Sequence, residues 1–255
     1  GAGFELGARA GPDDPALDRY ALVIGADGVQ SAVRARLNGA AKPFFTGQVA
    51  WRAVIADDGA PPEAHVYMGP GRHLVSYPLA GGLRNIVAVE ERDEWAAEGW
   101  HHQDDPANLR AAFAGFAPAP RGWLDRVTQV NLWGLFRHPV ARRWHDARTA
   151  ILGDAAHPTL PFLAQGANMA LEDAWVLADC LSARPVPEAL ALYQTRRRAR
   201  VVRVIEAANG NARNYHLRNP LARGAAHAAL RLGGALAPSA ALRRFAWLYG
   251  HDVTA

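Results

Sequence analysis

The chain has 255 residues, of which 50% are hydrophobic and 20% charged, enough for a packed core in one large or two small domains. The formal net charge is only +4, and Lys42 is the sole lysine, so almost all the basic side chains are arginine. No basic stripe is interleaved with aromatic residues, which argues against a nucleic-acid-binding surface.

The same sequence argues against a membrane or secreted protein. No apolar run approaches the ~18 residues that a membrane-spanning helix needs, and the first residues lack the basic and apolar segments of a signal peptide. Cys180 is the only cysteine, so no intrachain disulfide can form. We therefore expect a cytoplasmic protein without a disulfide framework.

The first part of the chain predicts a strand, a turn and a helix. Residues 1–19 have weak periodicity and predict an irregular lead-in. The apolar run over 20–24 is typical of a buried parallel strand. Ser31 then stands where the cap of a short helix over 32–37 is expected.

The middle of the chain changes to a sheet pattern. Four β-type segments, over 49–55, 65–68, 73–77 and 85–89, are separated by turn clusters rich in glycine, proline or aspartate. Their short spacings favour an antiparallel sheet. Residues 105–126 read as helical and broken by Pro118 and Pro120, and one more strand is expected over about 129–139.

The last part predicts a strand over 149–152 followed by long helices. One helix is expected from about Gln165 to 181, a second over about 187–217, and a final alanine-rich stretch around Leu230. The arginines at 196–198, with Arg200 and Arg203, are typical of a solvated helix face, with an anion site as the alternative.

The strongest chemical signal lies in residues 153–174, which read GDAAHPTLPFLAQGANMALEDA. Asp154 follows a strand, where its carboxylate could accept hydrogen bonds from polyol hydroxyls, and Gly153 lets backbone and ligand approach closely. A helix beginning at 166–168 has free amides that favour negative charge. His157 has no second ligand cluster at zinc-like spacing, so we expect no metal site, and either a loop-fixing role or a hydrogen bond next to the bound ligand.

Two further patterns carry candidate residues. Residues 24–34 form a strand–turn–helix in which glycines make a tight turn and Asp27 could cap that turn or accept hydrogen bonds from hydroxyl groups. Arg34 could reach a pyrophosphate or, taken alone, be a solvated arginine of the helix face. On the strand over 73–77, His73 and Tyr77 share one face. They could orient or deprotonate a phenol, which raises the electron density that electrophilic hydroxylation requires, or they could be half-buried sheet residues.

Together these segments resemble the FAD-dependent aromatic-ring monooxygenases, the group that includes salicylate hydroxylase. The resemblance rests on the Gly-Asp-Ala-Ala-His-Pro run at 153–158, on Pro161, on the Gln-Gly step at 165–166 and on Glu-Asp-Ala at 172–174, all at the family's spacing. The Asp-Gly pattern at 27–28 and the histidine and tyrosine four residues apart also match.

The resemblance implies roles for these residues. Asp154 would bind the ribityl chain, Pro161 would lie near the flavin ring, and the amides of Gly166, Ala167 and Asn168 would meet the ring carbonyls. The resemblance associates residues 27–34, with Asp27, Gly28 and Arg34, with FAD and NAD(P)H. It associates His73 and Tyr77 with the substrate.

The resemblance also implies a mixed α/β fold. A partial Rossmann-like FAD-binding domain would occupy 1–40 and 141–185, an inserted and mostly antiparallel sheet domain for the substrate 41–140, and C-terminal helices 186–255. The glycines at 1–7 do not have the spacing of the family's N-terminal Gly-x-Gly-x-x-Gly turn. We therefore expect the carboxyl-terminal two-thirds of such an enzyme, with weakened FAD binding.

The expected chemistry is hydroxylation of a phenolic or aromatic acid, with FAD as cofactor and NAD(P)H and dioxygen as co-substrates. Two alternatives stay open. One is a non-catalytic remnant or binding protein that does not hold FAD. The other is a flavin oxidoreductase of the same superfold that acts on a non-aromatic substrate, because fold alone does not specify chemistry.

Overall fold

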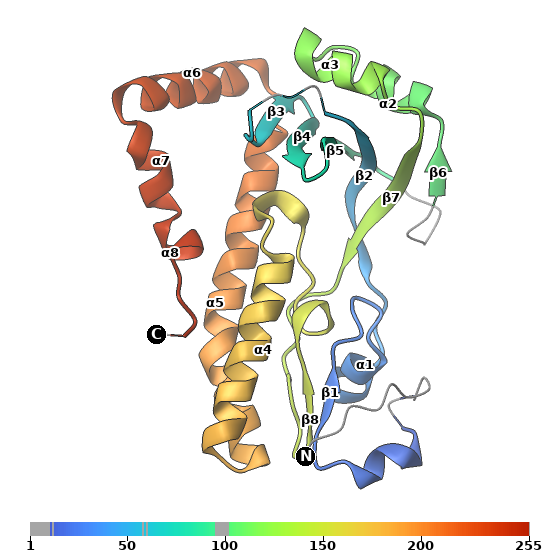
Figure 1. The fold of residues 1–255 in the computed structure, drawn as a ribbon, viewed down its shortest axis with the longest axis vertical. Helices are drawn as coiled ribbons and strands as arrows, with labels where there is room; N and C mark the ends of the chain where they lie inside the picture. The colour runs from blue at the N-terminus through green and yellow to red at the C-terminus, as the bar shows by residue number, and fades with distance from the viewer. Residues whose placement is uncertain (1–10, 12, 58, 60, 95–101, 255) are drawn as a thin grey trace. The chain divides into compact units, whose positions relative to one another are not determined.

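The computed structural model describes residues 11, 13–57, 59, 61–94 and 102–254 (Figure 1). The chain forms two compact units. Unit 1 comprises residues 1–44, 137–208 and 251–255, and unit 2 comprises residues 45–136 and 209–250. The glycines at 1–7 lie outside the described residues, and within the predicted irregular lead-in a short 3-10 helix, η1 (Pro15–Arg19), forms after Asp14.

Unit 1 contains a two-stranded parallel sheet of β1 (Val23–Gly25) and β8 (Thr149–Ile151), aligned so that Ile24 lies opposite Ala150. The predicted strand over 20–24 thus begins later than expected. After the turn, α1 (Ala32–Asn38) begins as predicted, since the Ser31 hydroxyl accepts a hydrogen bond from the Arg34 amide at 2.8 Å. This side-chain cap accepts a hydrogen bond from one of the first amides of the helix, which have no acceptor within the helix.

Two long helices complete unit 1. They are α4 (Gly166–Ala183) and α5 (Val186–Tyr215), of which residues 186–208 belong to this unit. The two helices run side by side (Figure 1) and are joined by ion pairs from Arg196 to Asp179 and from Arg197 to Asp173. Both helices end within a few residues of the predicted bounds.

Unit 2 is built on the predicted antiparallel sheet. Its six strands stand in the order β3-β4-β5-β2-β7-β6, and the described pairings of β2 with β5, β3 with β4, β4 with β5 and β6 with β7 are antiparallel. The strands are β2 (Phe44–Ala56), β3 (His65–Gly69), β4 (Arg72–Leu79), β5 (Leu83–Glu91), β6 (His102–Asp104) and β7 (Val130–Arg137). The short β6 was not predicted.

Two helices, α2 (Pro106–Ala112) and α3 (Pro118–Asp125), cover one face of this sheet. The region over 105–126 is helical and interrupted as predicted, but the interruption lies at 113–117, before the prolines: Pro118 begins α3 and Pro120 lies in its first turn, so Pro120 breaks no helix. Proline fits there, since the first amides of a helix have no intrahelical partner to lose. The core beneath α2 and α3 includes Leu74, Ile86, Ala88, Leu109, Phe113 and Leu124.

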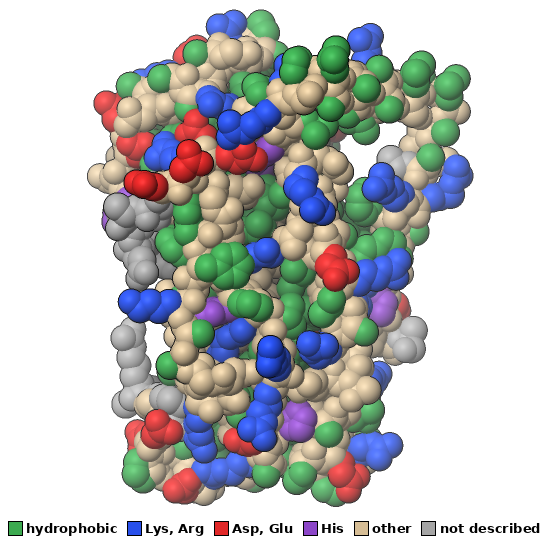
Figure 2. All heavy atoms as spheres, turned by 180° about the vertical axis from the view of Figure 1, so that it is seen from behind, with side chains coloured by type: hydrophobic (Ala, Val, Ile, Leu, Met, Phe, Trp, Pro, Cys, Tyr) green, Lys and Arg blue, Asp and Glu red, His purple; other side chains and the backbone are tan. Residues whose placement is uncertain are grey.

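The C-terminal part of unit 2 holds α6 (Pro220–Leu236), α7 (Pro238–Arg244) and α8 (Ala246–Tyr249). Of these, only α6 was predicted as a separate helix, and α7 and α8 lie within the C-terminal helical region expected over 186–255. Hydrophobic side chains lie exposed along α6 (Figure 2), with Leu221 at 83% and Leu236 at 82% of their full exposure. No helix in the described part of the chain is long and apolar enough to cross a bilayer.

The predicted domain limits can be compared with the two units. The limits at 40 and 140 lie a few residues from the ends of the first segment of each unit, at 44 and 136. The helical region expected over 186–255 is divided, because residues 186–208 and 251–255 belong to unit 1 and residues 209–250 to unit 2.

Gly25 allows β1 and α1 to approach closely, and this contact gives a first prediction. A Cβ atom at Gly25 would lie 2.6 Å from the Cβ of Val33. We expect Gly25→Ala to lower the free energy of unfolding in urea by about 1–3 kcal/mol, the usual cost of overpacking. The control is Gly122→Ala in α3, where an added Cβ meets nothing within 4 Å. Equal stabilities of the two variants would contradict the prediction.

Candidate functional site

The predicted Gly-Asp turn of unit 1 follows β8 as a short 3-10 helix, η2 (Gly153–Ala155). Gly153 has a φ of +58°, which glycine adopts without strain, and a Cβ atom there would lie 3.1 Å from that of Ala170. Asp154 is exposed at the strand end, and no described residue forms a hydrogen bond with its carboxylate. Partial enclosure raises the pKa of Asp154, while the nearby His157 acts against this shift.

The start of α4 supplies hydrogen-bond donors in the same unit. Its first intrahelical bond runs from the Met169 amide to the Gln165 carbonyl at 2.8 Å, so the amides of Gly166, Ala167 and Asn168 precede the hydrogen-bonded ladder. No side chain caps this helix start. The amides therefore form a positive end at which anionic or carbonyl groups bind favourably.

The loop between the turn and α4 has its own backbone constraints. Pro161 is exposed and begins the 3-10 helix η3 (Pro161–Leu163). Ala164, which follows, adopts a left-handed φ of +52°, a conformation that is uncommon for residues other than glycine. The Gln165 side chain donates back to the Leu163 carbonyl at 3.3 Å, so the loop is fixed immediately before α4.

A buried carboxylate, Asp173 of α4, ties the turn, the loop and α5 together. It is fully buried and accepts hydrogen bonds from the Gly153 amide at 3.0 Å, His157 Nε2 at 2.5 Å and Arg197 Nε at 2.8 Å. Burial alone would raise the pKa of Asp173, but the bonds from His157, Arg197 and Gly153 outweigh it and lower the pKa. His157 thus fixes the loop, one of the two roles expected from the sequence.

The arginines of α5 correct one prediction. Arg197 is 1% exposed and pairs with Glu172 at 2.7 Å as well as with Asp173. Arg200 pairs with Glu172 at 2.8 Å. The prediction of a solvated helix face was therefore wrong for Arg197, which lies inside unit 1.

The Asp-Gly segment of unit 1 forms a tight turn with Gly28 at a φ of +77°. The Asp27 carboxylate accepts hydrogen bonds from the Ser31 hydroxyl and from the Ala32 amide at 2.8 Å, so it caps the start of α1. The buried Arg34 donates to three backbone carbonyls, those of Ala155 at 3.0 Å, Ala156 at 3.1 Å and Pro139 at 2.6 Å.

These bonds give Arg34 a positioning role beside the Gly-Asp turn. Its contact with a pyrophosphate stays a prediction, as do the cofactor contacts of Asp27 and Gly28. Among the described residues, no group of three or more His, Cys, Asp or Glu side chains is arranged to hold a metal ion.

In unit 2, β4 positions His73 and Tyr77. Alternate residues of a strand point to opposite faces, and Leu74 packs into the core beneath α2 and α3, so His73 and Tyr77 belong to the other face. His73 is 2% exposed and Tyr77 is 37% exposed. Four residues of strand separate them by roughly 13 Å, so the two side chains could flank a ring but do not form a pair.

Sequence reasoning missed the partners of His73. Its Nδ1 lies 2.6 Å from Nε2 of His216, which follows α5, and Nδ1 of His216 lies 3.0 Å from the Glu91 carboxylate of β5. The Tyr215 ring lies 5.3 Å from the His73 ring. His73 and His216 are 143 residues apart in the chain, and no motif spacing connects them.

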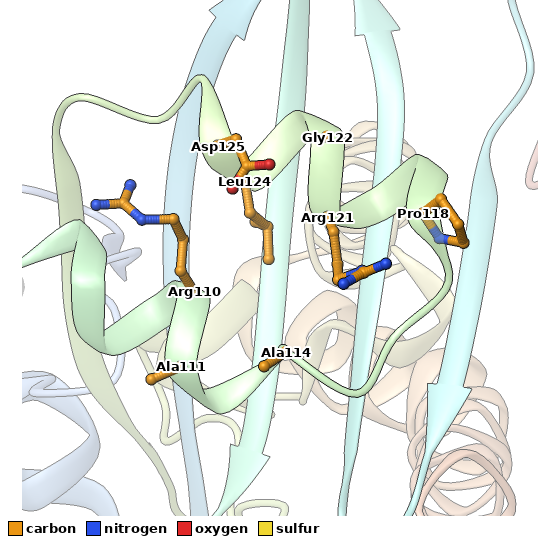
Figure 3. Close-up of a pocket in the computed structure, with 8 residues that line it drawn as sticks. All are labelled: Arg110, Ala111, Ala114, Pro118, Arg121, Gly122, Leu124 and Asp125. Atoms are coloured by element: carbon orange, nitrogen blue, oxygen red, sulfur yellow. The ribbon is translucent and has the colours of Figure 1, made fainter.

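A separate hollow of about 550 Å³ lies between α2 and α3 (Figure 3). Both helices cover the face of the sheet that carries Leu74, so the hollow and His73 lie on opposite sides of the sheet. The side chains of Arg110 and Arg121 extend in opposite directions (Figure 3), and Arg110 donates to the Val127 carbonyl at 3.3 Å. The two guanidinium groups therefore do not converge on one anion.

Comparison with known proteins agrees with the geometry of unit 1. Residues 19–208 match the family described as FAD binding domain. The chain belongs to this family. Its relatives include 3-amino-4-hydroxybenzoate 2-monooxygenase PtmB3 of Streptomyces platensis, 35% identical over 94% of this chain and 61% of the relative. They also include 3-hydroxybenzoate 6-hydroxylase of Polaromonas naphthalenivorans, 32% identical over 91% of this chain and 58% of the relative.

Solved structures show the same fold. A salicylate hydroxylase substrate complex superimposes with a TM-score of 0.77 and 26% identity, over 91% of this chain and 62% of that one. Klebsiella pneumoniae HpxO complexed with FAD and uric acid gives a TM-score of 0.70 and 26% identity, over 80% of this chain and 54% of that one. The chain thus spans about three-fifths of the length of the curated relatives named above.

The Asp173 cluster gives a second prediction. Asp173→Asn removes the charge that faces His157 and Arg197 and should lower the free energy of unfolding by about 3–5 kcal/mol, as for other broken buried ion pairs. The folded-state pKa of Asp173 lies below its ordinary value of 3.8, so its ionisation stabilises the fold above about pH 4 and this stabilisation is lost as the pH falls further. Urea unfolding at several pH values measures both effects.

Asp179→Asn is the matched control. Asp179 lies on the same helix and pairs with Arg196, but both side chains are about half exposed. Exposed pairs contribute at most about 1 kcal/mol. If Asp173→Asn lowered the free energy of unfolding no more than Asp179→Asn does, Asp173 would not be the residue that holds unit 1 together.

Proposed function

We propose that this protein contributes the flavin-ring and substrate parts of an FAD-dependent monooxygenase that hydroxylates a phenolic acid. The observation that carries the proposal is the Asp154 carboxylate beside β8, which has no hydrogen-bond partner among the described residues and lies in a loop and helix start that Asp173 fixes in place. Membership of the FAD binding domain family supports the same assignment.

The residues present fit the ribityl and ring half of FAD. Asp154 lacks a hydrogen-bond partner among the described residues, and a carboxylate in that position accepts hydrogen bonds from hydroxyl groups. The uncapped amides of Gly166, Ala167 and Asn168 would donate to the ring carbonyls and favour negative charge there. Pro161, at the exposed end of the loop, would lie against the ring.

Bound FAD would supply the oxygen chemistry, for which NAD(P)H provides the electrons and dioxygen the transferred hydroxyl group. The chain's own residues orient the substrate and control its protonation. In this proposal His73 accepts the proton of a phenol, and Tyr77 hydrogen-bonds to the substrate. Removing the phenol proton raises the electron density of the ring, which favours transfer of an electrophilic hydroxyl group.

The class of substrate follows from the relatives and from His73. The relatives described above are hydroxylases of hydroxybenzoates, and a buried imidazole nitrogen can accept a hydrogen bond from a phenolic hydroxyl. HpxO, which has a similar fold, is complexed with uric acid, so the fold by itself does not select the ring. Product analysis with 3-hydroxybenzoate and with uric acid separates the two substrate classes.

The cofactor assignment gives a third prediction. Asp154→Ala should weaken FAD binding about 10- to 100-fold, because a hydrogen bond to a charged group contributes about 1.5–3 kcal/mol. Titration of FAD against the protein, followed by flavin fluorescence, measures the dissociation constant. Asp154 has no hydrogen bond to lose within the described protein, so the variant should fold normally. Asp179→Ala, on the exposed side of α4, is the control, and an equal effect of the two changes would refute the role of Asp154.

The substrate assignment gives a fourth prediction. His73→Ala should slow hydroxylation about 100-fold while NAD(P)H oxidation continues at a higher rate, so that the enzyme consumes NAD(P)H without making product. The ratio of hydroxylated product to NAD(P)H consumed, with 3-hydroxybenzoate as substrate, measures this uncoupling. An unchanged ratio would show that His73 does not act on the substrate.

A further inference from the structure

Unit 2 contains a line of three hydrogen-bonded ionisable side chains, Glu91, His216 and His73. His73 Nδ1 lies 2.6 Å from His216 Nε2, and His216 Nδ1 lies 3.0 Å from an oxygen of Glu91. Both histidines are buried, at 2% and 4% exposure, whereas the Glu91 side chain is 30% exposed. The line therefore runs from a buried imidazole to a carboxylate at the surface.

The far end of the line is held in place by backbone and side-chain contacts. Arg218 pairs with the Glu91 carboxylate at 2.8 Å. The Gly71 amide donates to the His216 carbonyl at 3.2 Å, and the Glu91 amide donates to the Gly71 carbonyl at 2.9 Å. The turn between β3 and β4 is thus bonded both to His216 and to the end of β5, which fixes the positions of the three side chains.

The order of donors and acceptors follows from the carboxylate. An ionised Glu91 can only accept hydrogen bonds, so Nδ1 of His216 carries a proton. Nε2 of a neutral His216 is then an acceptor, and Nδ1 of His73 must donate to it. Both rings are therefore in the Nδ1–H form, and Nε2 of His73 carries a lone pair that can accept a proton.

Burial keeps both rings neutral near pH 7. Burial first, and repulsion from His216 whenever that ring is protonated second, lower the pKa of His73 to about 3. Burial also lowers the pKa of His216, with Glu91 acting against the shift and Arg218 adding to it. A cation confined to His73 would thus be unfavourable, and His73 alone would be a weak base.

We propose that Glu91 and His216 form a proton relay behind His73. The relay rests on the proposed function, in which His73 contacts the phenol. As the phenol O–H bond breaks, an Nε2–H bond forms on His73. The Nδ1 proton of His73 passes to Nε2 of His216, and the Nδ1 proton of His216 passes to Glu91. The result is a phenolate, two neutral imidazoles in the opposite tautomer, and a protonated Glu91 that can release its proton to water.

In this scheme His216 and Glu91 are positioning residues that act through His73. The buried rings stay neutral after the transfer, because each imidazole accepts one proton and donates another. The ionisable groups around it are Glu91 on β5, Arg218 and His216 after α5, Tyr215 in α5, and Tyr249 of α8, which interacts with Tyr215.

The first test needs neither flavin nor substrate. Nitrogen-15 NMR of histidine-labelled protein distinguishes the two neutral tautomers from the cation, and His73→Gln and His216→Gln variants assign the signals. We expect both rings in the Nδ1–H form at pH 7, and His73 still neutral at pH 5. A cation or an Nε2–H form of either ring at pH 7 would overturn the relay.

The second test uses 3-hydroxybenzoate hydroxylation by the protein with FAD and NAD(P)H. Glu91→Gln keeps a hydrogen-bonding group of the same size but cannot take up the proton. We expect kcat to fall about 100-fold at pH 7, with KM nearly unchanged, and to recover as the pH rises and the phenol ionises in solution. His216→Gln should show the same profile.

Glu90→Gln is the matched control, because Glu90 adjoins Glu91 on β5 but pairs with Arg72 and Arg92. It should keep the wild-type kcat and pH profile. A Glu91→Gln variant with the wild-type profile would overturn the relay while the proposed function stands. If the wild-type protein itself does not hydroxylate 3-hydroxybenzoate or another phenolic acid, the proposed function fails, whatever the tautomers found by NMR.

Discussion

The buried carboxylate of Asp173 is the interaction on which unit 1 depends. An isolated charge in a protein interior costs several kcal/mol, and close partners must compensate for it. Asp173 obtains them from three places in the chain, namely the amide of Gly153, the ring of His157 and the guanidinium of Arg197. The turn after β8, the following loop and α5 are therefore fixed by a single acceptor on α4.

The sequence predicts the local part of this arrangement well. A strand, a turn at Gly153 and a helix that begins near Gly166 were all predicted from residues within one short segment, 149–166. Arg197 is different, because its burial depends on how α5 packs on α4. A run of arginines has the same sequence whether the helix face is solvated or packs against buried carboxylates. Composition alone therefore could not predict that Arg197 is buried.

Unit 2 shows the same division between local and distant information. Alternating side chains and glycine-rich turns predict β2, β3, β4 and β5, because the alternation of residue types that indicates a strand lies entirely within that strand's own sequence. The contact of His73 with His216 joins residues 143 positions apart, and only the folded sheet and the chain after α5 bring them together. The sequence therefore pointed to His73 and left both His216 and Glu91 unnoticed.

The left-handed Ala164, just before α4, has a consequence for ligand affinity. Its φ of +52° is an unfavourable conformation for alanine, and the folded loop sustains it through the bonds of His157 and Gln165 to their neighbours. The entropy of ordering this loop is thus lost during folding and not during binding. A ligand that meets the amides of α4 would encounter a rigid, preorganised surface, which is the condition under which few contacts give useful affinity.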